Sequence, residues 1–189
     1  YAEPSEMIRK AFRLWQREVN HRGGLLGRPV ELLLYDDQSR IKRTADLYRR
    51  LIEKDRVDLV FSPYSTPLTL AASRVTERHE FVMLACGAAG QRIWQRGYKY
   101  VFGVYAPAER MFIGLLDLMA QHGQKRVWLV CDSSSSFNRD VMKGVHKWAD
   151  RFKIEVTDEQ AFSAAEQELP NILKRFKEDR ATAVLVSAY

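Results

Sequence analysis

Cysteine and histidine are scarce, and their positions exclude several kinds of site. Among the 189 residues only Cys86 and Cys131 are cysteines, too few for the disulfide framework of a small secreted domain. Each ends an apolar run typical of a separate strand, so we expect two free thiols. The four histidines are dispersed and lack the paired spacing of a zinc site. The sequence therefore predicts no metal site.

Long apolar runs and the common catalytic motifs are also missing. No run approaches the roughly 20 apolar residues that span a bilayer, so we expect no membrane span. Neither the G-x-S-x-G motif of hydrolases nor the G-x-x-x-x-G-K-[ST] phosphate loop occurs. The GGLLGR stretch at 23–28 leads into a predicted strand instead of a helix, which argues against a dinucleotide site. No cofactor is expected.

The charge is moderately basic but dispersed. The 30 basic and 24 acidic residues give a net charge of +6, and 46% of the residues are hydrophobic, as in a globular protein. Basic residues are scattered over many amphipathic segments, without a basic block or a basic-aromatic motif. This pattern indicates solvated helix faces and no nucleic-acid partner.

Helical and strand-like patterns alternate along the chain. Apolar residues at helical spacing predict six helices, at about 4–23, 41–52, 66–75, 107–122, 141–152 and 169–176. Short apolar runs predict seven strands, at about 28–37, 57–62, 81–90, 98–106, 125–132, 153–162 and 181–189. This alternation predicts an α/β protein with mostly parallel sheets covered by helices.

The stretch FSPYSTPLTLAAS, residues 61–73, carries the main candidate site. A predicted strand runs into Ser65 and Thr66, and Pro67 then starts a helix of small residues. One interpretation is structural: Thr66 caps the helix, and Pro67 suits its first turn. The other is functional, because hydroxyls beside the unpaired N–H groups of a helix N-terminus can bind a small anion such as a carboxylate.

An enzyme is the weaker hypothesis. Asp36 and Asp37 follow a predicted strand, where a metal or phosphoacceptor site is conceivable. Such residues more often cap the next turn, and we favour that interpretation. No acid–base pair can be placed from the sequence, so the prediction is a protein without enzymatic activity.

Several segments in a fixed order resemble one family. They are EVNHRGGLLGRPVELLLYDDQS, LIEKDRVDLVFSPYSTPLTLAAS and FVMLACGAAGQRIWQRGYKYVFGV, which cover most of residues 18–104, with KRVWLVCD and AVLVSAY as weaker matches later. These segments resemble type I periplasmic substrate-binding proteins of the branched-chain amino acid/amide group, the Leu/Ile/Val-binding-protein-like family of ABC transporters. The resemblance implies two Rossmann-like lobes joined by a hinge, in the periplasmic binding protein type I fold.

The resemblance also implies a domain division and a partial chain. Residues 1–104 would form the first ligand-binding lobe without its first strand, and residues 105–189 would form part of the second lobe. In open α/β sheets ligands bind outside the carboxyl ends of the strands, so the ligand is expected in the cleft between the lobes.

Carried over to this sequence, the resemblance places seven residues at the ligand. Ser65 and Thr66 would bind its α-carboxylate, and the backbone of Ala88 and Ala89 would meet the carboxylate or the ammonium group. Aromatic side chains would line the rest of the site. The alternatives of helix capping, tight loop packing and core packing stay open for these positions. The aromatic candidates are Tyr105, Phe137 and Tyr189.

The function implied is that of a solute-binding component of an ABC transporter. It would bind a small amino-acid-like or amide-like molecule and deliver it to a membrane permease. Its location would be periplasmic or extracellular, tethered to the membrane if it is a lipoprotein. Where many relatives carry a tyrosine-glycine pair this chain has SSSSFNRD at 133–140, which would suit a different ligand shape, such as an aromatic acid. The alternative is a ligand-sensing domain of a regulator or receptor with the same fold.

Overall fold

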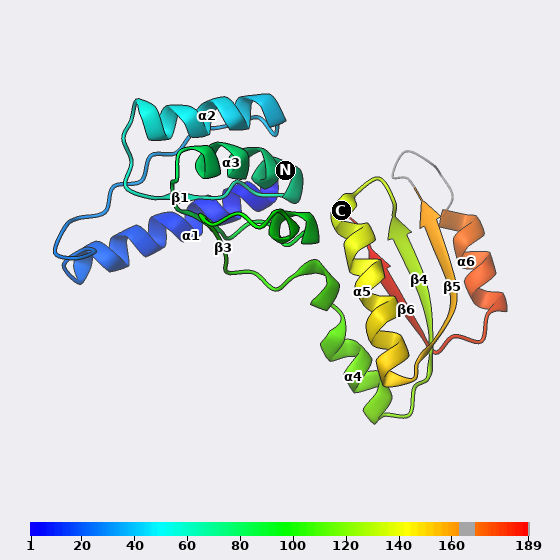
Figure 1. Cartoon of the computed structure of the whole chain (residues 1–189). Helices are drawn as coiled ribbons and strands as arrows, with labels where there is room; N and C mark the ends of the chain where they lie inside the picture. Colours follow the sequence, from blue (N-terminus) through cyan, green and yellow to red (C-terminus); the bar gives the residue numbers. More distant parts are fainter. Residues whose placement is uncertain (163–168, 189) are drawn as a thin grey trace. The chain divides into compact units, whose positions relative to one another are not determined.

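The chain folds into two compact α/β units (Figure 1). The computed structural model describes residues 1–162 and 169–188. Unit 1 consists of Tyr1–Ala88 and Arg96–Tyr105, and unit 2 consists of Ala89–Gln95 and Ala106–Tyr189. Each unit therefore contains one long segment of the chain and one short segment from the 89–105 region.

Unit 1 is a three-stranded parallel sheet with helices. Its strands lie in the order β1-β2-β3, with Val60 paired to Met83 and Met83 paired to Val101. The elements are α1 (Ala2–His21), α2 (Ile41–Glu53), β1 (Val60–Phe61), α3 (Thr66–Arg78), β2 (Met83–Ala85) and β3 (Val101–Gly103).

The core of unit 1 explains why α3 is rich in small residues. Ala72 and Val75 of α3 are buried against Val60, Met83 and Tyr48, which come from β1, β2 and α2. Small side chains allow α3 to lie close to both the sheet and α2. Helix α1 contributes two aromatic rings to unit 1. The ring centres of Phe12 and Trp15 lie 4.5 Å and 5.7 Å from the ring centre of Phe61.

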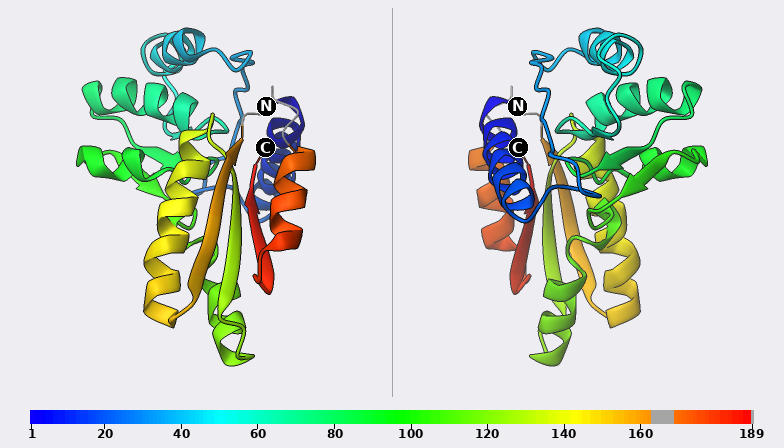
Figure 2. Two further views of the ribbon diagram at one scale, coloured as in Figure 1. Left: turned by 90° about the vertical axis from the view of Figure 1, so that its right-hand side faces the viewer. Right: turned by 90° about the vertical axis from the view of Figure 1, so that its left-hand side faces the viewer.

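Unit 2 is a second parallel sheet, in the order β5-β4-β6, with helices on both faces (Figure 2). Side chains alternate along the central strand β4, so Val127, Leu129 and Cys131 pack against the α4–α5 side. Trp128 and Val130 face the opposite side, with Ile172 of α6. The elements are η2 (Ala108–Arg110), α4 (Ile113–Gln121), β4 (Arg126–Asp132), α5 (Ser136–Phe152), β5 (Glu155–Phe162), α6 (Leu169–Glu178) and β6 (Ala183–Ser187).

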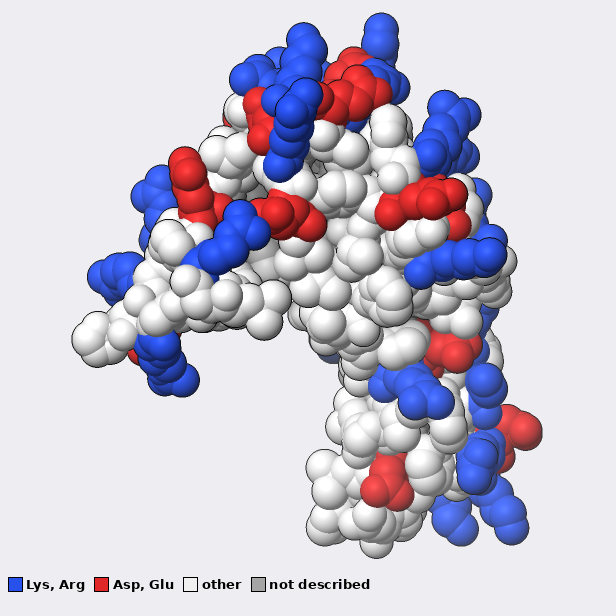
Figure 3. Space-filling model, turned by 60° about the vertical axis from the view of Figure 1, so that its left-hand side comes forward, with Lys and Arg blue, Asp and Glu red and all other residues white. Residues whose placement is uncertain are grey.

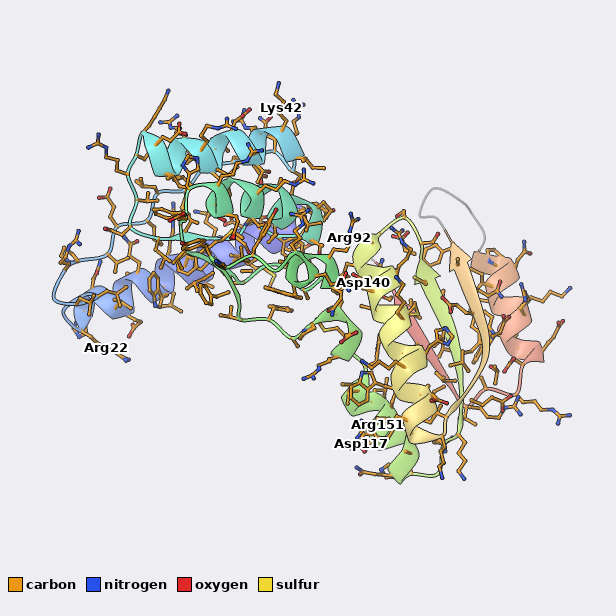
Figure 4. All side chains as sticks on the ribbon, in the orientation of Figure 1. Arg22, Lys42, Arg92, Asp117, Asp140 and Arg151 are labelled. Carbon is orange, nitrogen blue, oxygen red and sulfur yellow. The ribbon has the colours of Figure 1, made fainter. Side chains whose placement is uncertain are left out.

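A short 3-10 helix, η1 (Gln91–Arg96), was not predicted from the sequence. The backbone N–H of Gln91 donates to Asp140 Oδ2 of α5 at 3.0 Å, and the backbone N–H of Ala108 donates to the carbonyl of Ala89 at 2.8 Å. Figure 4 shows Asp140 on the side of α5 nearest η1. These bonds attach residues 89–95 to unit 2.

The predicted fold class is confirmed. One of the predicted strands, at about 28–37, is wrong. Six of the seven expected strands are present, and all pairing within the two sheets is parallel. Residues 29–37 form no strand, because an apolar run becomes a strand only where a neighbouring strand accepts its backbone hydrogen bonds. Instead Val30 is bonded to the side chain of Asn20, and Leu33, Leu34 and Tyr35 stay exposed.

Charged side chains of both signs are interspersed over the face displayed in Figure 3. Several basic residues pair locally with acids one helical turn away, as Arg9 does with Glu6 and Arg49 with Asp46. Exposed pairs of this kind contribute little to stability, because water and salt screen them. This distribution agrees with the solvated helix faces expected from the sequence.

Gly144 provides a test of the packing in unit 2. A Cβ on Gly144 of α5 would lie 2.2 Å from the carbonyl oxygen of Glu109, whereas a Cβ on Gly114 of α4 would meet nothing within 4 Å. We expect Gly144→Ala to lower the free energy of unfolding by about 1–3 kcal/mol, because backbone must move. Gly114→Ala should raise it by up to about 1 kcal/mol. Urea unfolding measures both, and equal effects would contradict this packing.

Tyr48 provides a pH test of unit 1. Its hydroxyl donates to the carbonyl of Phe61, and burial raises the pKa of Tyr48 well above its usual value of 10.0. Above about pH 10 the unfolded chain loses the tyrosine proton while the folded chain keeps it. The free energy of unfolding should then fall by up to about 1.4 kcal/mol per pH unit.

Tyr48→Phe removes this titrating group. Unfolding between about pH 8 and pH 11 should show a shallower decline for Tyr48→Phe than for the wild type. The variant should also be less stable at neutral pH, because the hydrogen bond to Phe61 is lost. Identical slopes in the two proteins would mean that Tyr48 does not titrate as inferred.

Candidate functional site

The loops that follow β1 and β2 are joined by hydrogen bonds at the carboxyl end of the unit 1 sheet. The hydroxyl of Ser62 accepts from the backbone N–H groups of Cys86 and Gly87, each at 3.2 Å. The N–H of Ser62 donates to the carbonyl of Leu84 at 2.8 Å, and the N–H of Ser65 donates to the carbonyl of Gly87 at 2.9 Å. Each loop thereby holds the other in place.

Gly87 is the point of closest approach between these loops. A Cβ at this position would lie 2.9 Å from the carbonyl oxygen of Pro63 and 3.0 Å from Cα of Tyr64. Only glycine fits here without movement of backbone. The close approach fixes the chain just before Ser65.

Ser65 has an unusual backbone conformation. Its φ is 87° and its ψ is 147°, a region that residues with a Cβ rarely adopt and that costs on the order of 1–3 kcal/mol. Such conformations persist only where surrounding contacts enforce them. Here the bond to Gly87 and the bond from the Thr69 N–H to the Ser65 carbonyl, at 3.1 Å, do so.

The structure corrects the predicted helix cap. Helix α3 begins at Thr66, so the N-cap position belongs to Ser65 and not to Thr66. Pro67 lies in the first turn, as predicted. The Ser65 side chain makes no capping hydrogen bond, and its Oγ is buried without a hydrogen-bond partner among the described residues. Ser65 itself is only 2% exposed.

This arrangement suits a small anion. A buried hydroxyl without a partner, the first-turn N–H of Leu68 and the positive end of the α3 dipole all favour a negative group at this helix start. The hydroxyl of Thr69 donates to the carbonyl of Pro63 at 3.1 Å and braces the loop that precedes the helix. The backbone at this helix start is therefore held by hydrogen bonds within the protein.

The other predicted residues are distributed over both units. Ala88 is buried in unit 1, directly after Gly87. Ala89 belongs to unit 2, where its side chain joins the core and its carbonyl accepts from Ala108. Tyr105 of unit 1 is 54% exposed, and Phe137 packs against the core of unit 2. Tyr189 lies outside the described residues.

Tyr64 was not among the predicted residues. Its ring lies 5.7 Å from that of Tyr1 in an edge-on contact. Burial raises the pKa of Tyr64, with smaller contributions from Tyr105 and Tyr1, so the phenol is neutral at neutral pH. Its position directly before Ser65 was the one feature of the sequence that indicated a place beside the candidate site.

Unit 2 has a polar network at the carboxyl ends of β4 and β6 that sequence reasoning also missed. The Nδ2 of Asn138 donates to the carbonyl of Asp132 at 3.3 Å, and the hydroxyl of Ser187 donates to Asn138 Oδ1 at 3.0 Å. The carboxylate of Asp132 accepts from the N–H and the hydroxyl of Ser134. All three of Asp132, Asn138 and Ser187 are buried. Asp132 and Ser187 could have been found as polar residues at the ends of apolar runs, whereas Asn138 lies in the first turn of α5 and had no such signal.

The acidic pair at the end of the 29–37 segment caps a turn, as favoured from the sequence. Asp36 Oδ1 accepts from the N–H of Gln38, and Asp37 Oδ1 accepts from the N–H of Ser39, both at 2.8 Å. The second oxygen of Asp37 accepts from the hydroxyl of Thr44. Across the described residues no cluster of His, Cys, Asp and Glu could hold a metal ion.

The two cysteines are free, and burial raises the pKa of both thiols. A raised pKa keeps a thiol protonated and poorly nucleophilic.

Among residues 1–162 and 169–188, no helix is both long enough and apolar enough to cross a membrane.

A family model described as "Periplasmic binding protein" matches residues 1–189. The chain belongs to the periplasmic binding protein family. The Leu/Ile/Val-binding protein homolog 8 of Brucella abortus is 32% identical over 102 residues, which are 54% of this chain and 25% of that protein. The resemblance predicted from the sequence is therefore confirmed.

Solved structures share the fold of this periplasmic binding protein. A solute-binding protein of an ABC transporter from Rhodopseudomonas palustris BisB5, in complex with 3,4-dihydroxybenzoic acid, has a TM-score of 0.84 and 21% identity, with 99% of this chain and 50% of that chain covered. A branched-chain amino acid transporter substrate-binding protein from Streptococcus pneumoniae, in complex with isoleucine, has a TM-score of 0.79 and 20% identity, with 94% and 50% covered. The chain thus spans about half the length of these solved relatives.

Ser62 tests the connection between the two loops of this periplasmic binding protein. Ser62→Ala removes the acceptor of two backbone N–H groups, one of them buried. We expect a loss of about 1–3 kcal/mol in the free energy of unfolding, because the buried donor is left unsatisfied. Urea unfolding measures it, and Ser5→Ala on the exposed face of α1 is the control. A loss no larger than that of Ser5→Ala would show that these bonds do not hold the loops.

Proposed function

We propose that this chain is part of the solute-binding component of an ABC transporter and that the start of α3 binds the carboxylate of its ligand. The single observation that carries the proposal is the buried, unpartnered Oγ of Ser65 at the N-cap of α3. Burying a hydroxyl without a partner costs about 1–3 kcal/mol, and a bound carboxylate oxygen would remove that cost.

The capping alternative explains less. A serine kept at an N-cap for helix stability would accept a hydrogen bond from an N–H of the first turn, and Ser65 does not. Its strained φ of 87° also opposes a purely structural role. Strain of this kind clusters at sites where binding requires a fixed geometry.

The ligand class follows from what the relatives share. The solved relatives are complexes with 3,4-dihydroxybenzoic acid and with isoleucine, and both molecules carry a carboxylate. A carboxylate accepts short, charge-assisted hydrogen bonds of the kind that Ser65 Oγ and Leu68 N–H can donate. The ligand proposed here is a small amino-acid-like or amide-like molecule, with aromatic acids included.

The proposed role is binding and delivery without covalent chemistry. Membership of the periplasmic binding protein family supports a location outside the cytoplasm and delivery to a membrane permease. A ligand-sensing domain of a regulator is less favoured, because the solved relatives described above are transporter proteins. Contacts from Ala88, Ala89, Tyr105, Phe137 and Tyr189 to the ligand stay predictions, as does the lobe division at 104/105.

Substitutions at Ser65 test the carboxylate site. In the full-length protein, Ser65→Ala with Thr66→Ala should weaken binding by about 1.5–3 kcal/mol for each charged hydrogen bond lost. Calorimetry should use the ligand that co-purifies, identified by mass spectrometry. Unchanged affinity would remove both residues from the site.

Ser65→Gly separates binding from folding. Glycine relieves the left-handed strain, so stability should stay equal or rise, while affinity should fall because the Ser65 hydroxyl is lost. Ser5→Ala should leave both quantities unchanged. A Ser65→Gly protein that binds as tightly as the wild type would contradict a role of the hydroxyl.

A further inference from the structure

Unit 1 contains a pocket away from the start of α3. It has a volume of about 470 Å³ and is lined by Arg74, Glu77, Arg78 and Tyr98. Arg74 lies eight residues beyond Thr66, about 12 Å along the helix axis. The pocket is therefore separate from the proposed carboxylate site.

The walls of this pocket are held together by polar contacts. Glu77 Oε1 accepts from the N–H of Lys99 at 3.0 Å, and Glu77 Oε2 accepts from the N–H of Tyr100 at 3.2 Å. Arg96 Nη1 donates to the carbonyl of Leu70 at 2.8 Å, and its guanidinium lies 5.5 Å from the centre of the Tyr98 ring. Residues 96–100 are thus hydrogen-bonded to α3 at Leu70 and at Glu77.

The two arginines of the pocket lack an acidic partner. Arg74 and Glu77 have the spacing of a helical ion pair, but both Glu77 oxygens are turned to backbone N–H groups. Across the described residues, neither Arg74 nor Arg78 forms an ion pair. At a separation of four residues, the two positive charges are neighbours that repel each other.

We propose that Arg74, Arg78 and Tyr98 bind a phosphate-type oxyanion in this pocket. Guanidinium groups match phosphate oxygens with paired hydrogen bonds, and an anion between them would remove their repulsion. The hydroxyl of Tyr98 has no hydrogen-bond partner among the described residues and supplies a further donor. The negative charge of Glu77 is offset by its two backbone donors. Free inorganic phosphate and the headgroup of an anionic phospholipid carry the same chemistry.

A titration with inorganic phosphate at constant ionic strength tests the proposal. In the full-length protein, NMR should show saturable shifts of the backbone amides of residues 74–78 and 98–100. Arg74→Ala with Arg78→Ala should weaken phosphate binding by about tenfold or more, and Tyr98→Phe should weaken it less. Ser65→Ala should leave phosphate binding unchanged, which keeps this result independent of the carboxylate proposal.

Arg13→Ala with Arg17→Ala is the matched control. This exposed pair has the same spacing on α1 but does not line the pocket of Arg74 and Arg78, so its removal should not change phosphate affinity. Equal weakening by both double variants would overturn the proposal, because net charge alone would then explain binding.

A second arm uses vesicles of phosphatidylglycerol, with phosphatidylcholine vesicles as the blank. Vesicle binding that is lost in Arg74→Ala/Arg78→Ala, but kept in Arg13→Ala/Arg17→Ala, would identify a lipid headgroup as the source. Saturable phosphate binding without vesicle binding would identify the free anion. Absence of both would overturn the proposal.

Discussion

Hydrogen bonds between the loops after β1 and β2 are the constraint on which the candidate site depends. Ser62 accepts from two backbone N–H groups of the second loop, and Ser65 donates back to Gly87. The absence of a side chain at Gly87 permits this contact. With both loops fixed, the strained conformation of Ser65 is maintained. Its hydroxyl therefore stays at the start of α3 without a hydrogen-bond partner among the described residues.

In unit 2, hydrogen bonds between different residues also join the segments at the carboxyl end of the sheet. Asp132, Asn138 and Ser187 join the ends of β4 and β6 to the first turns of α5 through buried hydrogen bonds. Parallel strands end at one edge of a sheet, so polar residues that follow them gather there. In unit 2 these groups satisfy one another, whereas in unit 1 the Ser65 hydroxyl is left over. That difference supports the proposal that the start of α3 binds a carboxylate.

Much of the fold could be predicted from local patterns. Helical spacing located α2 and α5 within a few residues, and the apolar run 125–132 located β4, because each buries a continuous apolar face. The prediction failed at residues 29–37, whose apolar run has no pairing strand. It also missed η1, which depends on a contact between Gln91 and Asp140, 49 residues apart.

The sequence by itself determined the α/β class, the family and the position of Ser65, Thr66 and Pro67 at the start of a helix, since these depend on spacing and on motifs in a fixed order. Only the tertiary structure decided that Ser65 is the N-cap, that its hydroxyl has no partner and that Arg74 and Arg78 share a pocket with Tyr98. The reason is physical: a hydrogen-bond partner and a pocket wall come from residues distant in the chain, and local sequence does not specify their approach.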